Sequence, residues 1–313
     1  MREIIIGTRE SALALWQTNW VLERLNNLNP DCTFRIKKLK TQGDKILDVA
    51  LAKIGDKGLF TKELEVAMLN GEIDLAVHSM KDLPTQLPAG LMIGAICQRT
   101  DPRDVVLSHL GYTLATLPPG AKVGTSSLRR KSQLLHYRPD LQIVDLRGNL
   151  NTRVAKLQQE GFAAIILAAA GVERMGYEQL VTEYISPDIS LPAVGQGSIG
   201  IEIRSEDEEI LHVVRKIADP ESTAAITAER SFLRTLEGGC QIPIGALGKV
   251  EGGKLHLAGL VAGLDGRLVI KDSVTGEISA AEDIGKMLAD KLLKLGAKQI
   301  LNQVRQEIEN SDS

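Results

Sequence analysis

The chain has 313 residues, of which 43% are hydrophobic and 25% charged, and its formal net charge is -3. This length exceeds what one small core needs, so we expect two or three domains. Aromatic residues make up only 3%, which argues against a nucleic-acid surface of stacking rings, as the net negative charge argues against polyanions. No apolar run of about 18 residues or signal-peptide pattern occurs, so we predict a cytoplasmic protein without a membrane partner.

The first hundred residues predict an α/β lobe. Strands are expected at 3–7, 34–39 and 73–77, and helices at 12–28 and 59–69. In the first helix Ala14, Val21, Leu25 and Leu28 form one apolar face, and Asn29-Pro30 ends it. The third strand delivers Ser79, Lys81 and Asp82 at its carboxyl end, where open α/β sheets bind ligands.

The stretch 41–58 predicts a mobile surface loop. It carries Lys45, Lys53 and Lys57 among three glycines and shows little periodicity. Loops of this kind close over binding sites.

A second lobe is predicted from Asp101 onward. Val123-Gly124-Thr125 repeats the pattern of Ile6-Gly7-Thr8, an apolar residue and Gly-Thr before a helix, which indicates two similar lobes. Further buried strands are expected at 143–146 and 163–169. The apolar segment 191–203 returns the chain to the first lobe.

The pattern changes near Asp219 to that of a small α+β domain. A helix at 222–236 leads to Gly238-Gly239-Cys240, strands within 254–274 turn at Asp265-Gly266, and a helix at 280–295 follows. The tail from 309 onward is expected to fray.

Positive charge gathers in the second lobe. Residues 121–160 hold eight Lys or Arg against three acidic residues. Arg129 and Arg130 follow Thr125 and Ser127 at a helix start, where free N–H groups favour anions. Guanidinium groups there suit the carboxylates or phosphates of a polyanionic small ligand, and the alternative is a solvated basic face.

Two further residues are candidates for chemistry. Asp82, at a strand end, can act as a general acid or base, and the alternative is an aspartate that starts a turn. Cys240 follows two glycines, so its thiol is presented on a loop or is an inert loop cysteine. His78 is expected to be structural, and five scattered histidines predict no metal site. No Walker-type motif is present.

The ordered motifs together resemble porphobilinogen deaminases. They are TRESALAL, KGLFTKELE, AVHSMKDLP, DPRD, VGTSSLRR, LRGNLNTR, ILAAAGVERMG, LPAVGQGSIGIE and LEGGCQIPIGA, and they span nearly the whole chain. One departure is Ser198, which stands where alanine is frequent after GQG.

The resemblance implies an α/β protein with two lobes like type II periplasmic-binding proteins plus a small C-terminal α+β domain. The implied domains are 1–98 with 198–216, 99–197, and 217–313. It also implies a usually monomeric transferase of tetrapyrrole biosynthesis that joins four porphobilinogen molecules head to tail, releasing ammonia, and yields 1-hydroxymethylbilane. A hand-over of this product to uroporphyrinogen-III synthase is expected.

The resemblance assigns roles by motif position. A dipyrromethane cofactor is attached to Cys240 by a thioether, and Asp82 assists loss of ammonia and stabilises cationic intermediates. Lys53, Lys57 and Phe60 fall in or near the mobile loop. The expected cofactor- and substrate-binding residues are Arg9, Ser79, Lys81, Thr125, Ser127, Arg129, Arg130, Arg147, Arg153, Arg174 and Gln196.

Two rival interpretations remain at this point. A two-lobed receptor for an anionic small molecule needs no turnover, and a cysteine-dependent hydrolase needs a base beside Cys240. The presented thiol and the missing signal peptide weigh against the receptor, and no local protease signature supports the hydrolase.

Overall fold

A computed structural model describes residues 3–41, 43, 60–236 and 242–311. The described residues divide into two compact units. Unit 1 contains 3–41, 43, 60–100 and 197–223, and unit 2 contains 101–196, 224–236 and 242–311. Lys53, Lys57 and Cys240 lie outside the described residues, as does nearly all of the loop predicted at 41–58.

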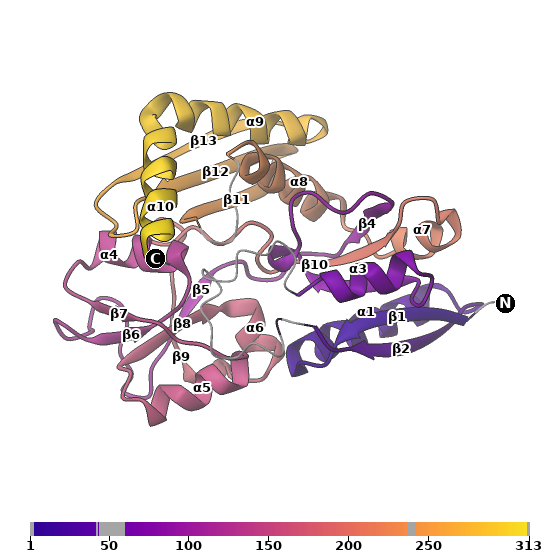
Figure 1. Cartoon of the computed structure of the whole chain (residues 1–313), viewed down its shortest axis with the longest axis horizontal. Helices are drawn as coiled ribbons and strands as arrows, with labels where there is room; N and C mark the ends of the chain where they lie inside the picture. Colours follow the sequence, from indigo (N-terminus) through magenta and orange to yellow (C-terminus); the bar gives the residue numbers. More distant parts are fainter. Residues whose placement is uncertain (1–2, 42, 44–59, 237–241, 312–313) are drawn as a thin grey trace. The chain divides into compact units, whose positions relative to one another are not determined.

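Unit 1 is built on a five-stranded mixed sheet (Figure 1). Its order is β2 (Thr33–Leu39), β1 (Glu3–Arg9), β3 (Leu75–Ser79), β10 (Ile199–Arg204) and β4 (Leu91–Ile96). β1 is parallel to β2 and β3, whereas β10 is antiparallel to β3 and β4. The predicted return of the chain to the first lobe is therefore confirmed by β10.

Helix α1 (Ala12–Leu28) begins at Ser11, whose Oγ accepts a hydrogen bond from the Ala14 backbone N–H at 3.3 Å. Val21 and Leu25 are fully buried, as predicted, but Leu28 is 44% exposed. Leu28 is the last helical residue, so it lies beyond the part of the helix that packs on the sheet. The other helices of unit 1 are α3 (Lys62–Leu69) and α7 (Glu208–Arg215).

Unit 2 repeats the topology of unit 1 in its first sheet. The order is β7 (Gln142–Val144), β6 (Lys122–Gly124), β8 (Ala164–Ala168), β5 (Asp104–Leu107) and β9 (Val181–Tyr184). β6 is parallel to β7 and β8, whereas β5 is antiparallel to β8 and β9. β6 thus takes the place that β1 has in unit 1, which explains the repeated Gly-Thr pattern. The helices are α4 (Leu128–Tyr137), α5 (Leu150–Gln159) and α6 (Ala169–Arg174).

The C-terminal part of unit 2 is an antiparallel sheet packed against helices (Figure 1). It contains β11 (Ile244–Glu251), β12 (Lys254–Ala262), β13 (Val269–Glu277), α9 (Ala281–Leu292) and α10 (Lys298–Ser311). It also contains most of α8 (Pro220–Thr235), whose residues 220–223 belong to unit 1. Phe232, Leu288 and Leu301 are buried in its core. α10 was not predicted, because Gly296 indicates a helix end. Gly296 does have a left-handed φ of 104°, but the chain resumes a helix at Lys298.

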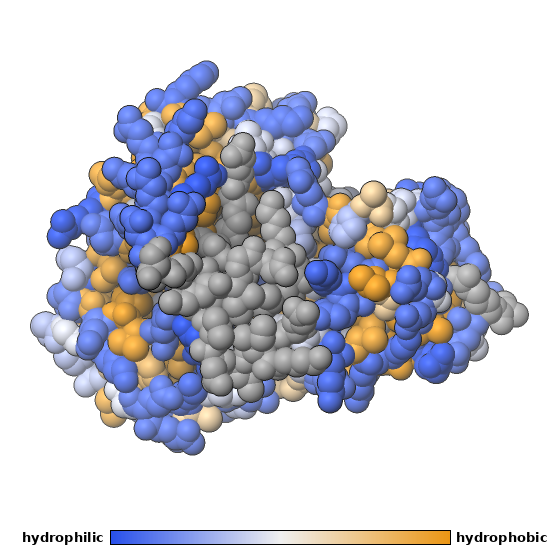
Figure 2. Space-filling view, in the orientation of Figure 1, coloured by the Kyte–Doolittle hydropathy of each residue, from blue (hydrophilic) through white to orange (hydrophobic). Residues whose placement is uncertain are grey.

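Short helical turns complete the described chain. They span Met80–Asp82 (η2), Glu178–Leu180 (η3), Ile278–Ala280 (η4) and Leu293–Ala297 (η5). The face in Figure 2 is mostly hydrophilic, with smaller hydrophobic areas among the polar residues.

None of the helices in the described ranges is long and apolar enough to cross a membrane.

Candidate active site

Four of the predicted site residues line one small cavity in unit 1. They are Arg9, Phe60, Ser79 and Asp82. Arg9 ends β1, Ser79 ends β3, and Asp82 lies in the turn η2 directly after β3. Because β1 and β3 are parallel, their carboxyl ends meet at the same edge of the sheet. This is the edge at which the sequence predicts ligand binding.

Arg9 and Phe60 contact each other at this cavity. The guanidinium carbon of Arg9 lies 4.2 Å from the centre of the Phe60 ring, within the range of a cation–π interaction. Phe60 therefore orients a cationic side chain at the edge of the cavity.

Gln17 is a cavity residue that the sequence analysis missed. Its Nε2 donates a hydrogen bond to Ser79 Oγ at 2.8 Å, and the side chain is buried in α1. The sequence does hold a signal for it. Gln17 is a polar residue on the apolar face of the helix, three residues after Ala14 and four before Val21. Gln17 fixes the Ser79 hydroxyl beside Asp82.

The turn that carries Lys81 and Asp82 is anchored through Met80. The Met80 backbone N–H donates to the Ser198 carbonyl at 3.0 Å, and the side chain is 1% exposed. A Cβ on Gly200 would lie 2.1 Å from Met80 Sδ, so only glycine leaves room for Met80 there. Met80 points inward while Lys81 and Asp82 stay partly exposed.

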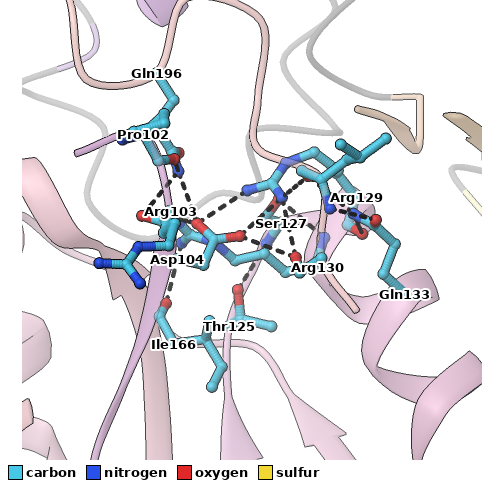
Figure 3. Close-up of polar contacts among 12 residues, drawn as sticks. Pro102, Arg103, Asp104, Thr125, Ser127, Arg129, Arg130, Gln133, Ile166 and Gln196 are labelled. Atoms are coloured by element: carbon cyan, nitrogen blue, oxygen red, sulfur yellow. Dashed lines mark hydrogen bonds and ion pairs between the residues drawn. The ribbon is translucent and has the colours of Figure 1, made fainter. Parts of the chain in front are cut away.

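In unit 2 the predicted Arg129 and Arg130 converge on one buried carboxylate, Asp104 (Figure 3). Arg129 Nη1 lies 2.8 Å from Asp104 Oδ2, and Arg130 Nη2 lies 2.8 Å from Asp104 Oδ1. The side chains of Arg129, Arg130 and Asp104 are 5%, 7% and 0% exposed. Both arginines come from the first turn of α4, and Asp104 begins β5.

Neighbouring polar groups complete this cluster. Gln196 Nε2 donates to Asp104 Oδ1 at 2.9 Å, and Arg130 Nη1 donates to the Ile166 carbonyl at 3.0 Å. Ser127 caps α4 by accepting the Arg130 backbone N–H, and Thr125 Oγ1 accepts the Ser127 N–H at 3.3 Å. Thr125 and Ser127 therefore position the start of α4.

Asp104 is ionised despite its burial. Burial alone would raise its pKa, but the charges and hydrogen bonds of Arg129 and Arg130 hold that pKa well below its usual range. Burial lowers the pKa of Arg129 and Asp104 opposes this, yet a guanidinium stays protonated in proteins. In the sequence Asp104 stands only within the motif DPRD, and nothing local there predicts its pairing with α4.

The cluster of Asp104, Arg129 and Arg130 has more positive than negative charge. One carboxylate faces two guanidinium groups. Nε of Arg129 is buried and has no hydrogen-bond partner within the part of the chain that the structure describes. The cluster carries a net positive charge, which favours an anion near it.

The three remaining predicted arginines are partly exposed and belong to unit 2. Arg147 lies in the loop after β7, with Nη2 3.5 Å from Asp145 Oδ2. Arg153 Nε donates to the Gly148 carbonyl at 2.8 Å, and Arg174 is the last residue of α6. Their guanidinium groups are thus more accessible than those of Arg129 and Arg130.

Two family models match this chain. The model described as "Porphobilinogen deaminase, dipyromethane cofactor binding domain" matches residues 4–212, and that described as "Porphobilinogen deaminase, C-terminal domain" matches residues 223–294. The chain belongs to the porphobilinogen deaminase family. Members of this family are transferases of tetrapyrrole biosynthesis, and the first matched domain binds the dipyrromethane cofactor.

Curated relatives match over nearly their full length. The porphobilinogen deaminase of Pelotomaculum thermopropionicum is 60% identical over 98% of both chains, and that of Carboxydothermus hydrogenoformans is 58% identical over 98% of both. The Nostoc sp. relative is 53% identical over 98% of this chain and 96% of its own.

One solved structure that the chain resembles is much less similar in sequence. The periplasmic aliphatic sulphonate-binding protein SsuA of Escherichia coli is 15% identical, with a TM-score of 0.42 over 76% of this chain and 71% of its own.

Proposed function

We propose that this chain condenses four porphobilinogen molecules head to tail on a dipyrromethane primer attached to Cys240, and releases 1-hydroxymethylbilane. The observation that carries the proposal is the buried cluster in which Asp104 offsets only one of the charges of Arg129 and Arg130. Porphobilinogen and the primer carry acetate and propionate side chains. Their carboxylates match the net positive charge of this cluster.

The donor set of unit 2 fits the primer. Arg147, Arg153 and Arg174 offer accessible guanidinium groups in the same unit as the buried cluster. Guanidinium forks bind carboxylates in bidentate fashion, which suits a ligand with several of them. When bound, the primer supplies the pyrrole carbon that receives the first new unit. Thr125, Ser127 and Gln196 hold the arginines and the start of α4 in place.

Asp82 is the catalytic residue of this proposal. Loss of ammonia breaks a C–N bond of porphobilinogen and leaves a cationic methylene-pyrrole, which a neighbouring carboxylate stabilises. Asp82 lines the cavity with Arg9, and Lys81 precedes it in the same turn. The two cations hold substrate carboxylates while Asp82 faces the cationic carbon. Ser79, fixed by Gln17, adds a hydroxyl at the same edge.

The intact mass of the denatured protein tests the primer. Protein from a host that makes porphobilinogen is expected to carry an added mass of two linked pyrrole units, and the Cys240→Ser variant is expected to lack it. An unmodified wild-type mass that persists after incubation with porphobilinogen would overturn the proposal in favour of the binding-module interpretation.

The Asp82→Asn variant tests the catalytic role. It is expected to carry the primer and to have an unchanged fold, but to lose activity by about 10²-fold or more, because the amide cannot stabilise the cation. Asp31→Asn is the matched control, since Asp31 is exposed in the same unit away from the cavity. Near-normal turnover in Asp82→Asn would remove Asp82 from the mechanism.

Further features belong to the same proposal. We propose three domains, 1–98 with 198–216, 99–197, and 217–313, supported by three separate sheets among the described residues. We also propose a cytoplasmic monomer that passes its product to uroporphyrinogen-III synthase. Lys53, Lys57 and Phe60 act in the loop that closes over the substrate. Size-exclusion chromatography with light scattering tests the monomer.

A further inference from the structure

Behind the cavity, His78 and Glu202 form a buried contact between strands β3 and β10. His78 Nε2 lies 3.0 Å from Glu202 Oε2, and the side chains are 3% and 0% exposed. The strands are antiparallel with His78 opposite Gly200, so Glu202 lies two residues further along on the same face. Neither carboxylate oxygen of Glu202 nor His78 Nε2 has a hydrogen-bond partner in the described parts of the chain, so the two side chains are in close contact without hydrogen-bond geometry.

In this environment the two side chains are each other's polar contact. A buried carboxylate without hydrogen bonds is costly unless it is neutralised. Removal of either side chain therefore leaves the other one buried without its polar contact.

Charged groups near this pair come from α3 and from the cavity. Glu65 and Glu63 approach from α3, and Arg9 and Asp82 line the same cavity as His78. Burial raises the pKa of Glu65; the negative charges of Glu202 and Glu63 add to this, while Thr61 and His78 oppose it.

The pair lies directly before the turn that carries Asp82. His78 precedes Ser79, and the turn Met80–Asp82 follows at once. The same strand, β10, also contacts Met80, because the Met80 side chain packs over Gly200. Two contacts with β10, one at His78 and one at Met80, therefore fix the end of β3 on both sides of Ser79.

We propose that His78 and Glu202 are positioning residues: their buried contact clamps β3 to β10 and holds the Asp82 carboxylate in its working orientation. This inference rests on the function proposed above, because it takes Asp82 as the catalytic group. His78 and Glu202 act through the turn and are not assigned contact with substrate.

The test uses Glu202→Gln, which keeps the shape of the side chain and removes the carboxylate. The matched control is Asp74→Asn. Asp74 Oδ1 pairs with Arg204 Nη2 at 2.9 Å, and this pair joins the far ends of the same two strands. Both variants lose one carboxylate of a partly or fully buried pair, but only Glu202 lies near Asp82.

Three properties are measured: the intact mass of the denatured protein, the urea midpoint of unfolding, and kcat and KM for porphobilinogen. Glu202→Gln is expected to carry the primer, with kcat lowered by about tenfold or more and KM changed by less than about twofold. Asp74→Asn is expected to change the urea midpoint and not kcat. The His78→Gln/Glu202→Gln double variant is expected to lose no more kcat than the worse single variant, because the two act as one unit.

Several outcomes would overturn the inference. These are a wild-type kcat in Glu202→Gln, an equal fall of kcat in Asp74→Asn, or additive losses in the double variant. His78→Gln breaks the same contact from β3, so it provides the same measurement when Glu202→Gln does not fold. A wild-type protein without primer and without turnover would instead refute the proposed function itself.

Discussion

Arg130 binds a single oxygen of Asp104 twice, through Nε at 3.0 Å and through Nη2 at 2.8 Å. The other oxygen of Asp104 is 2.8 Å from Arg129 Nη1. Asp104 is therefore the shared anchor of two adjacent arginines whose backbone already belongs to one helix. Its carboxylate determines where both guanidinium groups lie.

Asp104→Asn is expected to lower the free energy of unfolding by about 3–5 kcal/mol, because it leaves two buried guanidinium groups without a counter-charge. Urea denaturation at pH 7 measures the loss. Asp140→Asn is the control: Asp140 pairs with Arg138 at the surface, and such pairs contribute little. An Asp104→Asn midpoint equal to that of Asp140→Asn would contradict the anchor role.

The stability that Asp104 contributes is expected to depend on pH. Its folded pKa is held below the unfolded value of about 3.9. The contribution is therefore complete above the unfolded pKa and is lost as the pH falls toward the folded one. The difference in unfolding free energy between wild type and Asp104→Asn should be constant from pH 7 to pH 5 and shrink below about pH 4. A difference that grows in acid would have the wrong sign.

Arg147→Ala and Arg129→Ala are expected to differ in their effect on stability. Arg147 is partly exposed with a 3.5 Å ion pair, so its loss should leave the urea midpoint unchanged and reduce primer assembly or elongation. Arg129 is buried on Asp104, so its loss should lower the midpoint as well. Denatured mass and urea denaturation separate the two effects. An unchanged primer content and unchanged kinetics in Arg147→Ala would count against its assigned role.

The sequence predicts the parts of the site that depend on local pattern. Residues 75–77 are apolar, and the strand found at Leu75–Ser79, β3, delivers Asp82 to the carboxyl edge of the sheet as expected. The excess of arginine in 121–160 predicts an anion-binding unit without showing which arginines are buried. Arg129 and Arg147 have the same side chain, and only the fold makes one an internal anchor and the other accessible.

Long-range pairs could not be predicted from one sequence. Asp104 meets Arg129 across 25 positions, and His78 meets Glu202 across 124 positions. Neither contact has a local signature, because it arises from the order in which β5 and β10 enter their sheets. The missed helix α10 has a different cause: Gly296 has the left-handed φ typical of a helix end, and packing of Leu301 on the core restarts the helix.

Gly148→Ala is expected to disturb the arginine loop. Gly148 has a φ of +109°, and a Cβ there would lie 2.6 Å from Thr152 Cγ2. Its carbonyl also accepts the Arg153 Nε at 2.8 Å. Gly161→Ala is the control, because its φ is +67° and nothing lies within 4 Å of its added Cβ. Gly161→Ala should show only the backbone strain of about 1–2 kcal/mol, and Gly148→Ala a larger loss with lower activity. Equal losses of unfolding free energy would show that contact with Thr152 is unimportant.

Ser198→Ala is expected to stabilise the protein. Ser198 is 1% exposed, and its Oγ has no hydrogen-bond partner among the residues that the structure describes. A buried unpaired hydroxyl costs about 1–3 kcal/mol, while alanine keeps the Ser198 carbonyl that accepts the Met80 N–H. The urea midpoint should therefore rise by an amount equivalent to about 1 kcal/mol, with kcat unchanged.

The matched control for Ser198→Ala is Ser126→Ala. Ser126 Oγ donates to the Leu146 carbonyl at 2.8 Å and accepts the Leu146 N–H at 3.0 Å. Removing this hydroxyl breaks two hydrogen bonds and leaves two backbone groups unpaired, so the urea midpoint should fall. The same chemical change thus has opposite expected signs at two serines, and the sign depends on whether the hydroxyl has partners. A fall of the midpoint in both variants would mean that the Ser198 hydroxyl is hydrogen-bonded in solution.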